Sequence, residues 1–428
     1  MRRTLSPLRG LPVPRSPPDR IDLDAEFYDD LARREGGRAL ALVLDLVGRH
    51  SLWVDPAVAR AVPVVFPKTA RAVKGRGRQG QVVDGVRLWA NQPAQDAFYG
   101  ALGSTARHFK GAALCHIYPR SPQDPLHFTR LSDLVAVPAS LGAFTEGPPG
   151  LAVLKRRAYE LYGYRGPQSK IPPTPPICPA AWAPPVLLPA ALRTQTVARL
   201  RHWRATRPMY STPRRGQGPR RLAPLRKLES TRGLEADFWR EVTATPASLA
   251  ALVSLFVRYA RFAPPSIAAE VPNPFPLTRR ARRWQGERPG TIVGGIGLEF
   301  GQAPGMALLV TVGLPASRTV GEVVDHPWQG AAFLPAHNCR LAGLVLLPRS
   351  LSTLADSAPI RALLQRRLFE RTGYAGPAGR EPRRPAFYPD AWPETVHLSP
   401  AREAHAIKIL RRNLKERPQY YRPQADGR

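Results

Sequence analysis

The amino-acid sequence predicts an α+β protein that consists of two tandem homologous domains. The first observation is an internal repeat, because LSDLVAVPASL at 131–141 aligns without a gap with LAGLVLLPRSL at 341–351. The second is the extent of the repeat, since residues 24–213 recur as residues 234–423. The third is that each copy combines helical periodicity with short, apolar, β-branched runs. A repeat of this length indicates duplication of a whole domain.

Each copy is expected to open with an amphipathic helical segment, at 24–50 in the first copy and 235–260 in the second. A Pro-bounded loop follows, and then a β-strand at 81–89 or 291–300. These elements are expected to come before the part of each copy that carries the candidate chemistry.

A short helix is expected after this strand in the first copy only. Asn91 is a favourable N-cap residue, and Pro93 lies in the first turn of NQPAQDAFYGAL. The second copy has FGQAPGMALLV at this place, and we expect the helix to be lost there.

The centre of each copy predicts a strand, an irregular loop, a second strand and a helix. The second strands are DLVAVP at 133–138 and GLVLLP at 343–348, and the helix after each of them has apolar residues along one face. Gly163 and Gly373 stand where a left-handed helix C-cap is expected. Both copies are therefore expected to share one core of the same order.

The sequence before and between the copies has the composition of linkers. Residues 1–20 are basic and Pro-rich, and we expect a disordered arm there. Residues 214–233 are basic, rich in Gly and Pro and without apolar period, which predicts a linker. The homologous units are accordingly expected at 21–213 and 234–428.

The charge of the chain favours a polyanionic partner. Among its 428 residues, 63 are Lys or Arg and 32 are Asp or Glu, which gives a formal net charge of +31, carried mainly by arginine. The guanidinium group pairs with phosphate through two donors, and a strongly positive protein meets nucleic acid quickly. A GC-rich genome would also favour Arg over Lys, but that does not explain why acidic residues are so few.

Cysteine content and hydropathy argue against a thiolate zinc protein, a disulfide-rich protein and a membrane-spanning protein. Three cysteines, Cys115, Cys178 and Cys339, are too few for a four-thiolate zinc site or a disulfide framework. No apolar run approaches the ~18 residues that a membrane span needs. We therefore expect a cytoplasmic protein with no membrane partner.

A short motif in each copy resembles the HNH endonuclease family, whose fold is called ββα-metal. It consists of Cys115-His116-Ile117-Tyr118-Pro119 with Asp133-Leu134-Val135, and of Asp325-His326-Pro327 with Gly343-Leu344-Val345. The resemblance covers about 35 residues in each copy. It implies two HNH-like cores with flanking helices and, if they are active, hydrolysis of phosphodiester bonds with Mg²⁺ or Mn²⁺.

The resemblance also implies roles for individual residues. His116 and His326 would act as general bases on water. Glu146 and Asp356 would be metal ligands from the helix side, and Asp325 would be the strand-side ligand in the second copy. Cys115 takes that place in the first copy, and a thiol is a poor ligand for a hard cation. The Asn that orients the loop of the base in the family is replaced by Asp133 and by Gly343, so neither copy has the full triad.

Simpler interpretations stay open for the same residues. A histidine that occurs in both copies is often held by backbone hydrogen bonds in a structural role. Glu146 and Asp356 precede a helix, where an acidic side chain caps amides and complements the helix dipole. His127 and His337 could join the site or stabilise the fold. Two further functions also remain: a catalytically inactive nucleic-acid-binding scaffold, and a protein-interaction module based on the Pro-rich IPPTPPICPAAWAPP.

Basic helices that close each copy, at 191–208 and 401–418, favour nucleic-acid binding directly. Arginines stand three or six positions apart on each helix, so that one face can contact phosphates, and a tyrosine-containing arm follows. The residues expected to bind are Arg201, Arg204, Arg207, Arg411, Arg417, Tyr210 and Tyr420. We expect DNA rather than RNA as the partner, bound by a pseudo-dimer within one chain.

Overall fold

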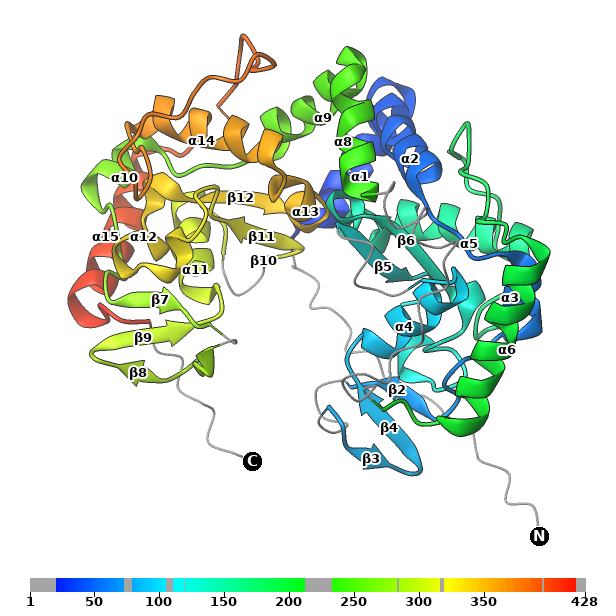
Figure 1. Cartoon of the computed structure of the whole chain (residues 1–428). Coiled ribbons are helices and arrows are strands. Elements are labelled where there is room, and N and C mark those ends of the chain that lie inside the picture. Colours follow the sequence, from blue (N-terminus) through cyan, green and yellow to red (C-terminus); the bar gives the residue numbers. More distant parts are fainter. Residues whose placement is uncertain are drawn as a thin grey trace.

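The computed structural model describes residues 21–72, 79–104, 111–119, 121–211, 233–282, 285–315, 319–394 and 396–420. The expected arm at 1–20 lies outside these residues, as does nearly all of the expected linker at 214–233. The fold is mixed α+β, with small sheets and many helices. Two halves, residues 21–211 and 233–420, form an arch in which the sheets β2–β4 and β7–β9 stand at the free ends (Figure 1).

The two halves present nearly the same order of elements. Those of the first half are β1 (Ile21–Asp22), α1 (Leu23–Arg33), α2 (Arg38–His50), α3 (Pro56–Ala61), β2 (Thr69–Arg71), β3 (Val82–Val83), β4 (Val86–Trp89), α4 (Gln92–Ala101), β5 (Ala112–His116), β6 (Leu134–Pro138), α5 (Pro148–Tyr162) and α6 (Ala190–Thr206). Those of the second half are α8 (Leu234–Ala244), α9 (Pro246–Tyr259), α10 (Pro265–Glu270), β7 (Thr278–Arg280), β8 (Ile292–Val293), β9 (Ile296–Glu299), α11 (Gln302–Thr311), β10 (Thr319–Val320), β11 (Glu322–Asp325), α12 (Pro335–Asn338), β12 (Val345–Pro348), α13 (Ser352–Ala355), α14 (Ala358–Thr372) and α15 (Pro400–Glu416).

The predicted centre of each copy has the expected order of strand, loop, strand and helix. Strands β5 and β6 pair antiparallel, with His116 opposite Leu134, and helix α5 follows. In the second half β11 and β12 pair antiparallel, with Asp325 opposite Val345, and α14 follows after the short α13. Gly163 and Gly373 end these helices with φ of 67° and 68°, which confirms the expected left-handed C-caps.

Two expectations about the outer part of each half were wrong. The segments 81–89 and 291–300 each form a two-stranded hairpin, because Asp84-Gly85 and Gly294-Gly295 adopt positive φ and turn the chain. Strand β4 then also pairs in parallel with β2, and β9 with β7.

The helix that we expected to be lost in the second copy is also present, as α11. The carboxylate of Glu299 accepts hydrogen bonds from the backbone N–H groups of Gln302 and Ala303, which replaces the N-cap that Asn91 was expected to supply. Pro304 causes no loss because it lies in the first turn, where an N–H group has no partner within the helix.

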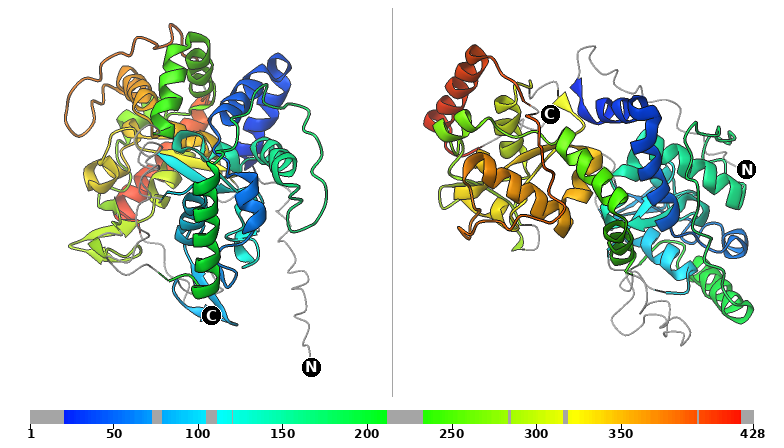
Figure 2. Two further views of the ribbon diagram at one scale, coloured as in Figure 1. Left: turned by 45° about the vertical axis from the view of Figure 1, so that its right-hand side comes forward. Right: turned by 90° about the horizontal axis from the view of Figure 1, so that it is seen from above.

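The first helix of each half packs on the other half. Leu23 of α1 belongs to the core cluster of the second half, with residues such as Ile267 and Leu344, whereas Leu234 of α8 belongs to the core of the first half. Strand β1 also pairs in parallel with β10 of the second half. Views from the side and from above place α1 and α8 at the junction of the halves (Figure 2).

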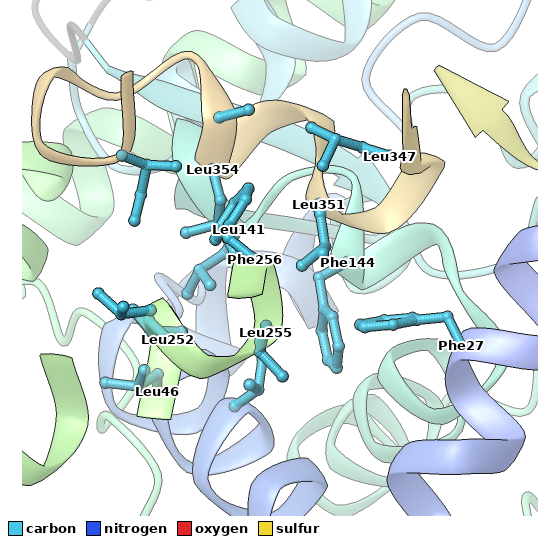
Figure 3. Close-up of a cluster of buried hydrophobic side chains, with 14 of the residues drawn as sticks. Phe27, Leu46, Leu141, Phe144, Leu252, Leu255, Phe256, Leu347, Leu351 and Leu354 are labelled. Atoms are coloured by element: carbon cyan, nitrogen blue, oxygen red, sulfur yellow. The ribbon is translucent and has the colours of Figure 1, made fainter. Parts of the chain in front are cut away.

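A third core cluster joins the two halves into one body. Its labelled side chains in Figure 3 come from both halves: Phe27, Leu46, Leu141, Phe144, Leu252, Leu255, Phe256, Leu347, Leu351 and Leu354. All are almost fully removed from solvent. Burial of a leucine or phenylalanine stabilises a fold by about 1.5–3 kcal/mol, so this shared cluster holds the halves together strongly.

The Pro-rich segments pack on their own halves. Trp182, in the segment that could have been a polyproline ligand, contacts Trp53 edge to face, and the Arg157 guanidinium lies 5.4 Å from its ring centroid. Arg367 covers Trp392 in the same way at 5.3 Å. These contacts hold the two tryptophans to their own halves, whereas Ile171 at the start of the first segment stays 53% exposed.

Within the described part of the chain, no single helix is long and apolar enough to cross a membrane. Helices α8 and α9 would pass such a test together by length and composition, but they meet at an angle of 102°.

Candidate functional site

Two histidines occupy equivalent places at the ends of β5 and β11, and each is bound to a backbone carbonyl group. The Nε2 atom of His116 lies 3.0 Å from the carbonyl oxygen of Phe128, and that of His326 lies 2.7 Å from the carbonyl oxygen of Asn338. A carbonyl oxygen can only accept, so Nε2 must carry the proton and Nδ1 must keep its lone pair. Both imidazoles are thus fixed in the tautomer that can accept a proton at Nδ1.

The surroundings keep both imidazoles neutral. Burial lowers the pKa of His116 and of His326 to about 4, and the carbonyl hydrogen bonds offset only part of this effect. The positive charge of Arg71 lowers the pKa of His116 further, and Arg280 does the same to His326. Both histidines are half-buried as whole residues. At neutral pH each half therefore presents a neutral imidazole within the electrostatic influence of a guanidinium group.

Arg71 and Arg280 are the last residues of β2 and β7, and both are exposed. The strands that carry them are held by equivalent hydrogen bonds. The hydroxyl group of Thr69 accepts one from the backbone N–H of Tyr210, and that of Thr278 accepts one from the backbone N–H of Tyr420. Our reading of the sequence missed these two arginines. The signal was present, because FPKTAR at 66–71 matches FPLTRR at 275–280 and ends each time in arginine.

The candidate metal ligands do not lie where the resemblance would put them relative to the bases. Neighbouring residues of a strand project to opposite faces, so residues 115 and 325 point away from residues 116 and 326. The charges that shift the pKa of His116 and His326 accordingly come from arginines, and Glu146, Asp133 and Asp356 are not among them. The structure does not bring either imidazole against a carboxylate.

It does bring two carboxylates together in the second half. Burial and the negative charge of Asp356 raise the pKa of Asp325 to about 6, whereas Arg280 and Arg361 act in the opposite direction. The charge of Arg280 therefore acts on both Asp325 and His326. Arg280 therefore links the carboxylate pair and the imidazole electrostatically.

The first half has no such pair. The buried thiol of Cys115 lies 3.1 Å from the hydroxyl group of Thr145, and burial, with a contribution from Glu146, raises its pKa to about 11. A thiol that stays protonated does not bind a hard divalent cation. The place of Cys115 and Glu146 in the first half therefore does not fit a magnesium or manganese site.

Asp133 is completely buried and holds the loop that follows His116. Its carboxylate accepts hydrogen bonds from the backbone N–H of Tyr118, at 3.2 Å, and from the hydroxyl group of Ser121. Burial raises the pKa of Asp133 well above its usual value. Its counterpart Gly343 leaves room for the ring of Tyr374, since a Cβ atom there would lie 2.7 Å from Cε1 of that ring. Asp133 is thus a positioning residue.

The structure also tests whether Glu146 and Asp356 cap the helices that follow them. The N-caps of α5 and α14 are Gly147 and Ser357, without side-chain cap hydrogen bonds, and Glu146 and Asp356 are exposed beside them. Helix capping therefore does not account for these two carboxylates.

His127 and His337 make contacts that stabilise the fold, which was one of the two roles expected for them. Their Nδ1 atoms lie 2.7 Å and 2.6 Å from the hydroxyl groups of Tyr164 and Tyr374. An arginine covers each of these tyrosine rings.

Few possible metal ligands lie close together in the described residues. Within the described residues, no group of three or more His, Cys, Asp or Glu side chains is placed to hold a metal ion. The pair of Asp325 and Asp356 supplies the carboxylate oxygens that hard cations prefer, and a divalent cation would relieve the repulsion that raises the pKa of Asp325. These are two ligands, fewer than the three side chains that a protein metal site usually supplies.

The closing helices present most of the expected basic residues to solvent. Arg201 and Arg204 of α6 are exposed, and Arg207 is half-buried at its C-cap. On α15, Arg411 forms an ion pair with Glu270, and Arg417 is exposed at the C-cap. A shallow hollow on α15 is lined by His405, Lys408, Arg411, Arg412 and Lys415, among others. The basic character of these helices is therefore available to a ligand.

The tyrosines after these helices differ from expectation. Tyr210 is only 2% exposed, packs edge to face on Phe66, and donates to Asp96 at 2.6 Å. It is a core residue and cannot stack on a base. Tyr420 is half-buried against Phe275, and its backbone is anchored to Thr278. Both tyrosines fasten the closing helix to the small sheet.

No protein-family model matches this chain, and no curated protein or solved structure matches it either.

Proposed function

We propose that the protein binds nucleic acid, preferably duplex DNA, as a pseudo-dimer within one chain, and that the second half hydrolyses a phosphodiester bond. The observation that carries the proposal is the pair formed by a neutral, tautomer-fixed imidazole and an exposed arginine, which occurs in both halves as His116 with Arg71 and as His326 with Arg280. A guanidinium group holds a phosphate, and an imidazole with a free lone pair accepts a proton from water.

The chemistry follows from the charges near His326. Arg280 binds the phosphate that is to be attacked, and the Nδ1 atom of His326 takes the proton from the attacking water. The pKa of about 4 guarantees a free lone pair but makes the imidazole a weak base. A phosphate bound by Arg280 adds negative charge and neutralises the guanidinium, and both effects raise the pKa of His326 toward neutrality. The base thus becomes effective when substrate binds.

Asp325 and Asp356 would hold the divalent cation. A cation held there would offset negative charge on the phosphate that Arg280 binds, since the charge of Arg280 acts on both Asp325 and His326. The first half lacks the carboxylate pair, because Cys115 replaces one partner, and we assign it the role of gripping the duplex. The basic faces of α6 and α15 extend the contact with phosphates.

The proposal is tested on the full-length protein with supercoiled plasmid in Mg²⁺ and in Mn²⁺. We expect the wild type to nick the plasmid, His326→Ala to lose at least 100-fold in rate, and the matched variant His116→Ala to keep most of it. Binding of a labelled duplex, measured in parallel, should change little in either variant.

Two outcomes would contradict the proposal. Absence of nicking by the wild type in both metals removes the hydrolase function and leaves a nucleic-acid-binding scaffold. Absence of salt-sensitive duplex binding removes the nucleic-acid function as a whole.

A further inference from the structure

A cavity of about 190 Å³ lies at the junction of the two halves, and neither His116 nor His326 is among its lining residues. Helix α1 of the first half supplies one wall, and the end of α9, residue 261 and strand β12 of the second half supply the other. The lining residues are Leu23, Glu26, Phe27, Asp30, Tyr259, Arg261, Leu346, Leu347 and Pro348. The volume is well above the ~10–15 Å³ that a single water molecule requires.

The charged side chains in this cavity are divided between its walls. Glu26 and Asp30 lie on α1, and the hydroxyl group of Tyr259 donates to the Asp30 carboxylate. Arg261 faces them from the second half, and its backbone is fixed by two hydrogen bonds of 2.9 Å with Leu346. Burial lowers the pKa of Arg261, and the charge of Glu26 acts in the opposite direction. A guanidinium group stays charged in proteins because its ordinary pKa is so high. The rest of the lining is apolar.

The equivalent position in the first half is filled. Leu52 pairs with Ala136 there as Arg261 pairs with Leu346, and Leu52 is only 3% exposed. Glu241, the counterpart of Asp30, is engaged by Arg49 and by the Nε2 atom of His50 at 2.9 Å. Asp30 is engaged in a similar way, by Arg34 and by the hydroxyl group of Tyr259. The halves therefore differ in one residue, a buried leucine in the first and an arginine that lines a cavity in the second. Packing of the junction does not itself require Arg261.

We propose that this cavity binds a free apolar α-amino acid. The ligand carboxylate would pair with Arg261, its ammonium group with Glu26, and its side chain would contact Leu23, Phe27 and Leu346. A simple anion would be repelled by the carboxylates of Glu26 and Asp30. A simple cation would be repelled by Arg261, and by Arg34 and Arg258, whose charges act on Asp30. A zwitterion with an apolar side chain satisfies both walls at once.

Binding at this place stabilises the junction, because the walls come from different halves. A ligand that binds only the folded protein raises its stability by RT ln(1 + [L]/Kd), and the melting temperature follows. The site is independent of the proposed nuclease function, so either can fail without the other.

The experiment is thermal denaturation and isothermal titration calorimetry of the full-length protein with L-leucine at pH 7. We expect L-leucine to raise Tm in a concentration-dependent way and to bind with one-to-one stoichiometry. N-acetyl-L-leucine, which lacks the ammonium group, and isoamylamine, which lacks the carboxylate, should bind at least 10-fold more weakly. This pattern is the signature of a zwitterion site.

Two variants locate the site. Arg261→Leu introduces the residue that the first half has at this position, and Glu26→Gln changes an exposed side chain on the opposite wall. Both should keep the wild-type circular dichroism spectrum and lose at least 10-fold in affinity for L-leucine. The proposal is overturned if L-leucine at 10 mM, a concentration on the order of weak metabolite binding, gives no shift in the wild type. Unchanged affinity in Glu26→Gln or equal binding of N-acetyl-L-leucine overturns it too.

Discussion

The carboxylate of Asp24 accepts two hydrogen bonds from Ser350 in the other half of the chain, one from the backbone N–H at 2.9 Å and one from the hydroxyl group at 3.0 Å. Glu235 repeats this contact with Ser140. Each first helix is therefore bound, through one acidic residue, to the turn that follows the second central strand of the opposite half.

Ser350→Ala is expected to destabilise the protein by about 1–3 kcal/mol, because it leaves Asp24 and Tyr28 with one partner fewer at a half-buried place. Urea unfolding monitored by circular dichroism measures the loss. Ser352→Ala is the matched control, since the Ser352 hydroxyl only contacts a nearby backbone carbonyl at the surface. Equal unfolding midpoints for the two variants would show that the contact between Asp24 and Ser350 contributes nothing.

The two imidazoles predict a loss of stability in mild acid. Their folded-state pKa of about 4 lies below the unfolded value of 6.5, so the unfolded chain binds more protons between these values. The stability that belongs to the neutral rings is fully present above pH 6.5 and is lost as pH falls toward 4. Each imidazole should contribute about 1–3 kcal/mol to this loss.

His116→Gln with His326→Gln should flatten this part of the stability profile, as measured by urea unfolding between pH 7 and pH 4. His202→Gln is a suitable control because that ring is exposed on α6. A double variant with the same slope as the wild type would mean that the two rings are not buried in the neutral form.

Cys115→Asp should give the first half the carboxylate pair that the second half has. The new carboxylate would stand near Glu146, as Asp325 stands near Asp356. If the proposed function holds, the wild type nicks one strand, and this variant produces linear plasmid directly. Cys178→Asp, at an exposed cysteine, should leave the product unchanged. Linear product from the wild type, before nicked circles accumulate, would contradict the assigned difference between the halves.

Arg71→Gln and Arg280→Gln should each weaken duplex binding and lower the slope of log K against log salt by about one phosphate contact. Filter binding at several salt concentrations between about 50 and 200 mM measures the slopes. Over this range the affinity of a protein with several phosphate contacts falls by roughly 10³-fold. Arg240→Gln removes an exposed arginine that pairs with Asp237 and should leave the slope unaltered. The same slope in all variants would place the contact with nucleic acid elsewhere.

The order of elements could be read from the sequence because hydrophobic period and helix ends are local properties. The central strands, the helices with Gly163 and Gly373 at their ends, and the closing basic helices are of this kind. Helix α11 was missed because its cap comes from Glu299, at the end of a strand that had been read as continuous. A side chain that reaches forward over a turn leaves no regular pattern in the sequence.

The candidate site was harder to predict because it depends on contacts between distant segments. The motif identified His116 and His326 but not the face of the strand from which each projects. The charges of Arg71 and Arg280 act on these rings only because β2 and β7 pack against the loops between the central strands. Tyr210 was expected in an arm that binds nucleic acid, and its burial against Phe66 follows from how the chain after α6 returns to the sheet.

The exchange of first helices has a consequence for how the chain folds as it is synthesised. Helix α1 leaves the ribosome early, but Ser350 and the core that receives Leu23 follow roughly 300 residues later. At 5–20 residues per second this delay lasts tens of seconds. During that time an amphipathic helix has no surface to cover its apolar side, so nascent chains on one messenger are at risk of pairing with each other, and a chaperone that shields the emerging N-terminal segment would raise the yield of correctly closed molecules.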